Sequence, residues 1–249
     1  MPHPRLTAAL WAAFAVTTAH ADTPAFDRPG IAFSTTTLPP GTVSWEQGLP
    51  DFQRDDDSGV RTTQYVADTN LRIGLADRIE VQLSGAPFNV AHARGAPTER
   101  GGGDSGVTVK IALPSRDGPF SWALEAGATF ATGSRAFTAG DDGGNVAVTL
   151  QYDVSDAVSS SLLVGASRSG GVTTRAWSPG IGFAIDERFG VYVEAGFEHP
   201  HGGPATRVAG GGMTWMATPR VQLDLSVDFG VNDAAPDVQG GLGFSVYFD

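Results

Sequence analysis

Apolar and polar residues alternate along most of this chain, which restricts it to structures built from β-strands. The clearest case is residues 221–232, where Val, Leu, Leu, Val, Phe and Val take every second position and polar or small residues lie between them. Successive side chains of a strand point to opposite faces, whereas apolar residues of a helix recur every three or four positions. Residues 189–198 and 242–248 repeat the alternation. The sequence therefore predicts an all-β protein.

The alternating segments number about twelve and are about ten residues long, which is the length of a tilted strand that crosses a bilayer. Short turns and longer, Gly- and Pro-rich loops alternate between them, as in outer-membrane barrels with short periplasmic turns. The predicted strands are residues 42–48, 60–75, 79–88, 105–114, 119–132, 144–154, 157–168, 173–185, 189–199, 206–217, 220–231 and 238–248.

Apolar and polar residues also alternate in the strands of a soluble β-sandwich, so the composition of the polar faces has to distinguish the two architectures. Here those faces are rich in Gly, Ser and Ala with single spaced acids, which suits a confined lumen better than a water-exposed surface. Aromatic residues near strand ends suit interfacial girdles; they are Trp45, Trp122, Trp177, Trp215 and Phe248. We therefore predict a single transmembrane, antiparallel, up-and-down β-barrel over residues 22–249.

The first 21 residues have the features of a secretory signal peptide. Arg5 precedes an apolar run at residues 6–16, and Ala19 and Ala21 occupy the small-residue positions of a cleavage site. A buried N-terminal helix is the alternative, but the segment has no polar face. We expect export, cleavage before Asp22 and localisation in a bacterial outer membrane.

Composition excludes several other classes. The chain has no Cys, which removes disulfides, thiolate metal sites and lipid attachment. Its formal net charge of −11 disfavours nucleic acid as a partner. After the signal segment, no apolar run approaches the length of a transmembrane helix.

Consistent alternation assigns mostly acidic residues to the barrel interior. Eight acids, including Glu198, are opposed by two bases. Such a lumen would favour cations or offer acceptors to hydroxylated solutes; the alternative is that the acids pair with the bases and brace the wall. The lumen-lining candidates are Glu46, Arg72, Glu80, Lys110, Glu125, Asp153, Tyr192, Glu194, Asp224 and Asp228.

Other polar groups give weaker signals. Arg residues in the short turns either contact anionic headgroups or are merely solvated; they are Arg78, Arg116, Arg188 and Arg220. The acidic run at residues 55–57 lacks the spacing of a calcium loop, and His92, His199 and His201 form no clear metal motif. We predict no metal site.

No enzyme or cofactor motif is evident. An outer-membrane phospholipase would need a Ser with a His base, but the three His residues after the signal segment lie in or beside predicted loops, and no G-x-S-x-G occurs. No nucleotide-binding loop precedes a helix. We predict a protein without catalytic residues or cofactors.

Several segments resemble the transporter-like outer-membrane family named for a putative MetA-pathway phenol-degradation role. They are residues 26–30, 38–41, 46–50, 71–80, 178–182, 191–194 and, most specifically, 223–237. The resemblance covers nearly all of the chain after the signal segment and implies a small outer-membrane barrel linked to uptake of aromatic compounds. It carries over no site residues.

Together these observations predict passive transport of small solutes, with hydrophobic or phenolic compounds as the class that the resemblance implies. The alternative is a structural or surface-interaction barrel whose lumen is plugged. Expected partners are outer-membrane lipids and lipopolysaccharide, the small solute, and the barrel assembly machinery. That machinery would read the closing pattern, whose residues are Leu242, Phe244, Val246 and Phe248. Asp249 departs from the usual aromatic last residue of such a signal.

Overall fold

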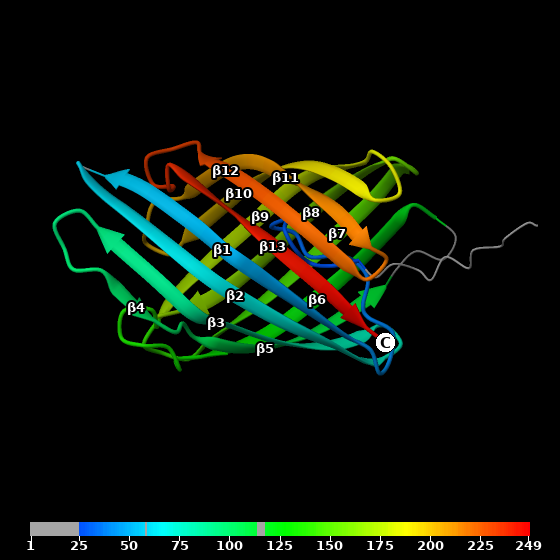
Figure 1. The fold of residues 1–249 in the computed structure, drawn as a ribbon, viewed down its shortest axis with the longest axis horizontal. Coiled ribbons are helices and arrows are strands. Elements are labelled where there is room, and N and C mark those ends of the chain that lie inside the picture. Colours follow the sequence, from blue (N-terminus) through cyan, green and yellow to red (C-terminus); the bar gives the residue numbers. More distant parts are fainter. Residues whose placement is uncertain (1–24, 58, 114–117) are drawn as a thin grey trace, which may run out of the picture.

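A computed structural model describes residues 25–57, 59–113 and 118–249, and these form a closed antiparallel barrel (Figure 1). The predicted signal peptide and Arg116 lie outside the described residues. The strands are β1 (Val43–Asp57), β2 (Val60–Ala76), β3 (Ile79–Ala93), β4 (Glu99–Gly101), β5 (Ser105–Leu113), β6 (Phe120–Phe130), β7 (Gly143–Ser155), β8 (Val158–Ser169), β9 (Val172–Ala184), β10 (Phe189–Pro200), β11 (Thr206–Thr218), β12 (Val221–Gly230) and β13 (Val238–Phe248).

Twelve of these strands form the barrel wall, as the alternation predicts. The order runs from β2 through β1 and β13 back to β3, and a pairing of β2 with β3 closes the circle. The first and last strands pair in register from Val43 opposite Phe248 to Arg54 opposite Val238. The short strand β4 pairs only with β3 and adds no step to the wall. Because the barrel is closed, no wall strand leaves an edge unpaired along its full length.

The two ends of the barrel differ in their connections. At the end where the chain terminates, β2 and β3 are joined by residues 77–78 and β11 and β12 by residues 219–220, whereas the longest connections, residues 131–142 and 231–237, lie at the opposite end together with two short ones. We call the end where the chain terminates the turn end and the opposite end the loop end. Short turns face the periplasm in outer-membrane barrels, so the loop end is extracellular.

The outer face is apolar and the inner face is polar or small. On β13, Leu242 is 55% exposed whereas the neighbouring Gly243 and Ser245 are buried. Trp45, Trp177, Trp215 and Phe248 are likewise exposed. An apolar exterior around a closed barrel is the architecture of an outer-membrane protein. Within the described residues, no helix is long and apolar enough to cross a membrane.

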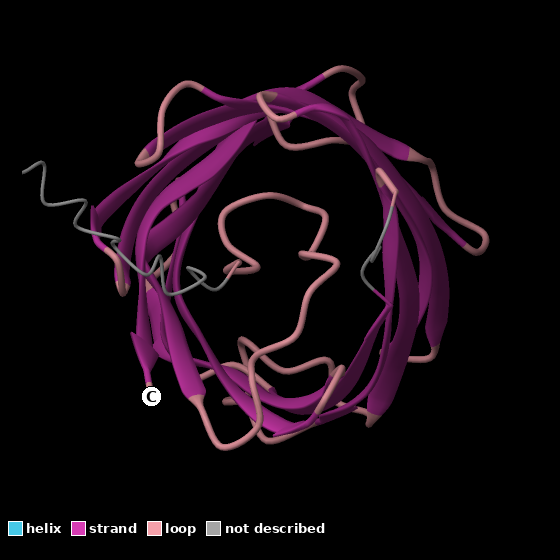
Figure 2. Cartoon of the chain, turned by 90° about the vertical axis from the view of Figure 1, so that its right-hand side faces the viewer, coloured by secondary structure: helices cyan, strands magenta, loops and turns pink. Residues whose placement is uncertain are grey.

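The lumen contains the chain that precedes β1. Residues 25–42, which we call the inner segment, loop through the interior of the barrel in the end-on view (Figure 2). Phe33 packs against Ala112, Ala123 and Leu163 of the wall, and Leu38 is 1% exposed. These contacts form the small apolar core of the protein. The sequence did not predict this segment, and it fills much of a lumen that small side chains would otherwise leave open.

Two other details correct the sequence prediction. We expected a loop at residues 49–59, but β1 continues to Asp57 because residues 51–57 pair with residues 60–66 of β2 across a tight turn. The register shifts between Gln47 and Asp51, so a bulge hides the alternation there. The expected loop at residues 89–104 instead includes the end of β3 and the short β4.

Gly74 tests the seating of the inner segment. Gly74 N donates to Thr42 O at 3.0 Å, and a Cβ at this position would collide with the carbonyl oxygen of Pro39. We predict that Gly74→Ala lowers the free energy of unfolding by roughly 1–3 kcal/mol, as overpacking does. The measurement is a urea titration in which the folded fraction is determined from the heat-modifiable mobility of the barrel on a gel. Gly85→Ala is the control, because its Cβ would meet only Asp104 O, at 3.9 Å; equal losses in both variants would contradict the prediction.

Candidate functional site

The guanidinium of Arg72 is the centre of a buried charge cluster between the wall and the inner segment. It donates to both carboxylate oxygens of Glu80 at 2.8 and 3.0 Å and to Glu46 at 2.8 Å. Asp27 of the inner segment lies 3.3 Å from its Nε. Arg72, Glu46 and Glu80 are all at most 1% exposed. Buried charges are tolerated only when paired and hydrogen-bonded, and here each has several partners.

The carboxylates also accept hydrogen bonds from the backbone of the inner segment. Glu46 accepts from the amides of Asp27 and Arg28, the latter at 2.8 Å. Glu80 accepts from the amide of Leu38, and Glu194 from that of Ile31, both at 2.8 Å. A segment inside a barrel has no ladder of its own, so its buried amides need such acceptors. Wall acids therefore position this segment along its length.

Lys110 makes the second strong connection. Its Nζ donates to Asp27 Oδ1 at 2.7 Å and to Ser34 Oγ at 3.1 Å, and lies 4.0 Å from Glu125. It also lies 5.2 Å from the ring centre of Phe33. Burial raises the pKa of Asp27, but the positive charges of Arg72 and Lys110 outweigh that effect and lower it to about 2. Asp27 is therefore ionised at neutral pH.

Arg28 forms a separate cluster with three wall acids. Its guanidinium makes a two-pronged bond to Asp51 at 2.9 Å and reaches Asp68 at 3.2 Å and Asp224 at 3.3 Å. Its carbonyl oxygen accepts from Gln222 at 3.2 Å. One half-buried cation thus links β1, β2 and β12 through the inner segment. The planar guanidinium can satisfy several carboxylates at once, which a lysine ammonium does less well.

Three recesses follow one another along the inner wall beside the inner segment. The recess at the turn end, about 680 Å³, includes Gln151, Asp153 and Tyr192. The middle one, about 210 Å³, shares Tyr192 with it and Glu194 with the third. The third, about 280 Å³, continues towards the loop end past Asp228 and Gln239. Shared lining residues make the three recesses adjacent, and we call this series the path.

Polar atoms along this path lack partners inside the described part of the protein. They are the Tyr192 hydroxyl and one carboxylate oxygen of Asp228. Asp228 is 5% exposed and its other oxygen accepts from Gln239 at 3.4 Å. Buried polar atoms need partners, so an ordered water molecule or a small side-chain rearrangement would have to satisfy these groups.

The predicted interior residues have different roles. Glu46, Arg72, Glu80, Lys110, Glu194 and Asp224 contact the inner segment, and Glu125 lies beside Lys110. Tyr192, Glu194 and Asp228 border the path. Asp153 accepts from Gln151 at the turn end. Sequence reasoning missed Asp27, Arg28, Asp51 and Asp68, because only the contacts across the lumen identify them. The motif at residues 26–30 was the available signal.

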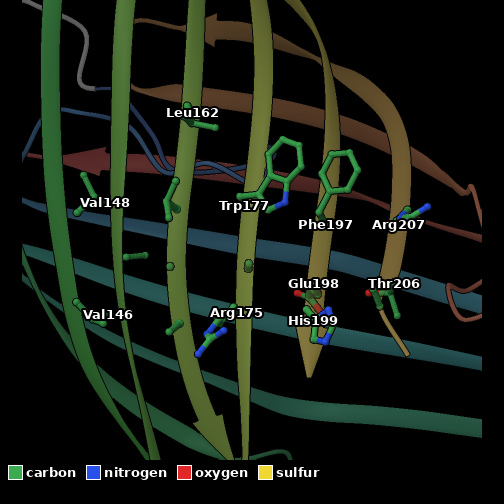
Figure 3. A pocket seen from close by; sticks show the side chains of 16 residues that line it. Val146, Val148, Leu162, Arg175, Trp177, Phe197, Glu198, His199, Thr206 and Arg207 are labelled. Carbon is green, nitrogen blue, oxygen red and sulfur yellow. The ribbon is translucent and has the colours of Figure 1, made fainter. Parts of the chain in front are cut away.

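The weaker candidates do not assemble into a site. His92 Nδ1 lies 3.1 Å from Thr98 Oγ1, and Asp56 pairs with Arg61 at the loop end. Among the described residues no three His, Asp or Glu side chains are arranged to hold a metal ion. A further recess of about 900 Å³ lies along β7 to β11, where Trp177 and Phe197 stack (Figure 3).

Arg72 tests the buried charge cluster. We predict that Arg72→Met lowers the free energy of unfolding by about 3–5 kcal/mol, because it leaves two buried carboxylates without their cation. Urea titration of the folded barrel measures the change. The control is Arg220→Met, which breaks the exposed pair with Asp249 and is expected to cost below about 1 kcal/mol. An Arg72 variant as stable as the control would contradict this account.

Asp27 gives the seating of the inner segment a predicted pH dependence. The pKa of Asp27 is about 2 when the segment is seated, compared with an ordinary value of 3.8. Its contribution to holding the segment is therefore complete above about pH 4 and is lost as the pH falls through about 2. We expect a label on the inner segment to become accessible in that window, as measured by quenching of a fluorophore attached to the variant Thr36→Cys, which leaves the Phe33 packing intact. Asp27→Asn is expected to remove this transition. A transition of equal size in that variant would assign it to another group.

Comparisons with known proteins agree with this architecture. The Pseudomonas putida F1 COG4313 outer membrane channel is similar in structure, with a TM-score of 0.68, 15% identity and coverage of 88% of this chain and 99% of that one. The KdgM porin, solved with disordered oligogalacturonate, has a TM-score of 0.56 at 9% identity and covers 84% and 99%. The NanC porin has a TM-score of 0.51 at 10% identity and covers 83% and 99%. At these identities the likeness establishes the fold alone.

No curated protein matches the sequence. The family model described as "Putative MetA-pathway of phenol degradation" matches residues 26–248, which includes residues 26–42 of the inner segment and every strand of the barrel. The chain belongs to this family.

Proposed function

We propose that this barrel allows small solutes to cross the outer membrane passively, along the narrow acidic path between the inner segment and the wall. The observation that carries the proposal is the series of three recesses joined at Tyr192 and Glu194. A path with binding groups at several points lets a solute enter and leave without one deep trap. The outer-membrane channels of similar fold are consistent with this role.

The dimensions of the path restrict the solute. The middle recess of about 210 Å³ has room for roughly seven water molecules, at about 30 Å³ each. We therefore expect compounds of the size of a single ring, and the family description makes phenolic compounds the first class to test. Apolar Phe26 and Phe33 and the Tyr192 ring line this recess beside Glu194, so a small amphipathic solute fits its chemistry.

A non-transporting barrel is the competing function. The inner segment supports it, because the charge clusters around Arg72 and Arg28 hold that segment across the lumen. A structural or surface-interaction protein would gain rigidity from such a plug without conducting anything. Conduction distinguishes the two functions.

Transport is tested with the mature chain in planar bilayers and liposomes. The proposal predicts small, discrete, cation-selective conductance steps under a salt gradient. It also predicts that phenol enters liposomes that contain the barrel faster than it enters protein-free liposomes, whereas the barrel does not accelerate entry of a disaccharide. A barrel that inserts and folds but neither conducts nor admits phenol would favour the structural function.

Glu194 and Asp228 test the acidic path. We predict that the double variant Glu194→Gln and Asp228→Asn shifts the reversal potential towards zero, because two negative charges beside the path are removed. Glu187→Gln with Asp186→Asn is the matched control, since these acids lie in a turn outside the strands. An unchanged reversal potential in the first pair would remove both acids from the selectivity mechanism.

A further inference from the structure

Basic side chains gather on the outer face of the barrel at the loop end of four consecutive strands. They are Arg168 on β8, Arg175 on β9, His199 on β10 and Arg207 on β11, and all four are exposed. Their orientation follows from their neighbours in the alternation. Ser178 on β9 and Val208 on β11 are buried, and a Cβ on Gly196 of β10 would meet Ile31 of the inner segment, so these three positions face the lumen. Arg175, His199 and Arg207 lie an odd number of residues away on the same strands and therefore face outwards.

The strand register brings these residues to nearly one level. Arg175 lies opposite His199, and the next outward residues, Trp177 and Phe197, lie opposite each other. Phe197 in turn lies opposite Arg207 on the other side. The outward positions of β8 to β11, all of them in the described part of the chain, include no Asp or Glu. A chain with a net charge of −11 thus segregates positive charge onto this patch.

The basic residues have no ion-pair partner among the described residues. By contrast, the buried cations Arg28, Arg72 and Lys110 each contact carboxylates. The guanidinium groups of Arg168, Arg175 and Arg207 therefore remain available for an anion outside the barrel. Arginine is suited to phosphate, because its planar fork donates two parallel hydrogen bonds.

An apolar surface lies directly next to the patch, on the side of the membrane core. The rings of Trp177 and Phe197 stack with centres 3.9 Å apart and planes at 3°. Figure 3 shows this pair on neighbouring strands, with Arg175 and His199 nearer the strand ends. Val146 and Val164, 48% and 51% exposed, extend the surface, and both line the recess of about 900 Å³ together with the rings and Arg175.

We propose that this patch, Arg168, Arg175, His199 and Arg207 above the Trp177–Phe197 stack, binds a phosphorylated glycolipid of the outer leaflet, the lipid A part of lipopolysaccharide. Its phosphates would contact the arginines, and its acyl chains would lie on the aromatic and aliphatic surface below. The loop end is extracellular, so the patch sits at the level of the outer-leaflet headgroups. The two chemistries of the patch, basic above and apolar below, match the two parts of such a lipid and not a free anion.

The test is native mass spectrometry of the folded mature barrel in detergent with bisphosphorylated lipid A. We expect the double variant Arg175→Gln and Arg207→Gln to bind it at least about tenfold more weakly than the unmodified chain, the effect of losing charge-assisted hydrogen bonds. The matched control is Arg94→Gln with Arg100→Gln, which removes the same charge at the loop end of the opposite wall. Heat-modifiable mobility verifies that each variant is folded.

Three results would overturn the proposal. Equal binding by both double variants would indicate general attraction between charges and not a site. Equal binding of dephosphorylated lipid A would remove the phosphate contacts. Displacement of lipid A by millimolar inorganic phosphate would indicate a free-anion site. Selective loss with Arg175 and Arg207, combined with weak binding of the dephosphorylated lipid and resistance to phosphate, would support it.

Discussion

The seating of the inner segment depends on the burial of Arg72 among Glu46, Glu80 and Asp27. An unpaired guanidinium in the interior would cost several kcal/mol, and so would each unpaired carboxylate. Asp27 comes from the inner segment and the other three groups from the wall. The hydrogen bonds of the two wall carboxylates are complete only when this segment occupies the lumen, because its backbone amides donate to Glu46 and Glu80. Lys110 and Arg28 extend the same principle to the neighbouring strands.

This arrangement explains how a barrel of twelve strands, with small residues on much of its inner face, has a narrow interior. The inner segment lies against Ala112, Ala123 and Leu163 on one side through Phe33. The path that remains follows the wall at Tyr192, Glu194 and Asp228. Seating and passage are thus linked, because Glu194 both accepts a hydrogen bond from Ile31 of the segment and borders the path. Basic residues without an ion-pair partner lie instead on the outer face of β8 to β11.

The strands could be predicted from the sequence because alternation is a local property. The alternation of residues such as Val221, Leu223 and Leu225 identifies the outward face of β12 without reference to any other strand. The same parity assigned Glu46, Arg72, Glu80 and Lys110 to one face, and the register then places Lys110 between Glu80 and Glu125. The inner segment has no such period. Asp27 and Lys110 are 83 residues apart, and Arg28 and Asp224 are 196 apart, so no local pattern connects them. The bulge after Gln47 likewise concealed the outer half of β1, because a shift of one residue reverses the faces.

The central claim is that the inner segment limits the bore while charged wall residues hold it in place. Single-channel conductance of residues 22–249, compared with a variant of the same chain lacking residues 25–38, tests this most directly in the same bilayer and salt. The account predicts small steps for the full chain and a several-fold larger conductance for the shortened one, together with a loss of thermal stability. Equal conductance from both, with both barrels folded, would show that the inner segment does not control passage and would contradict the account.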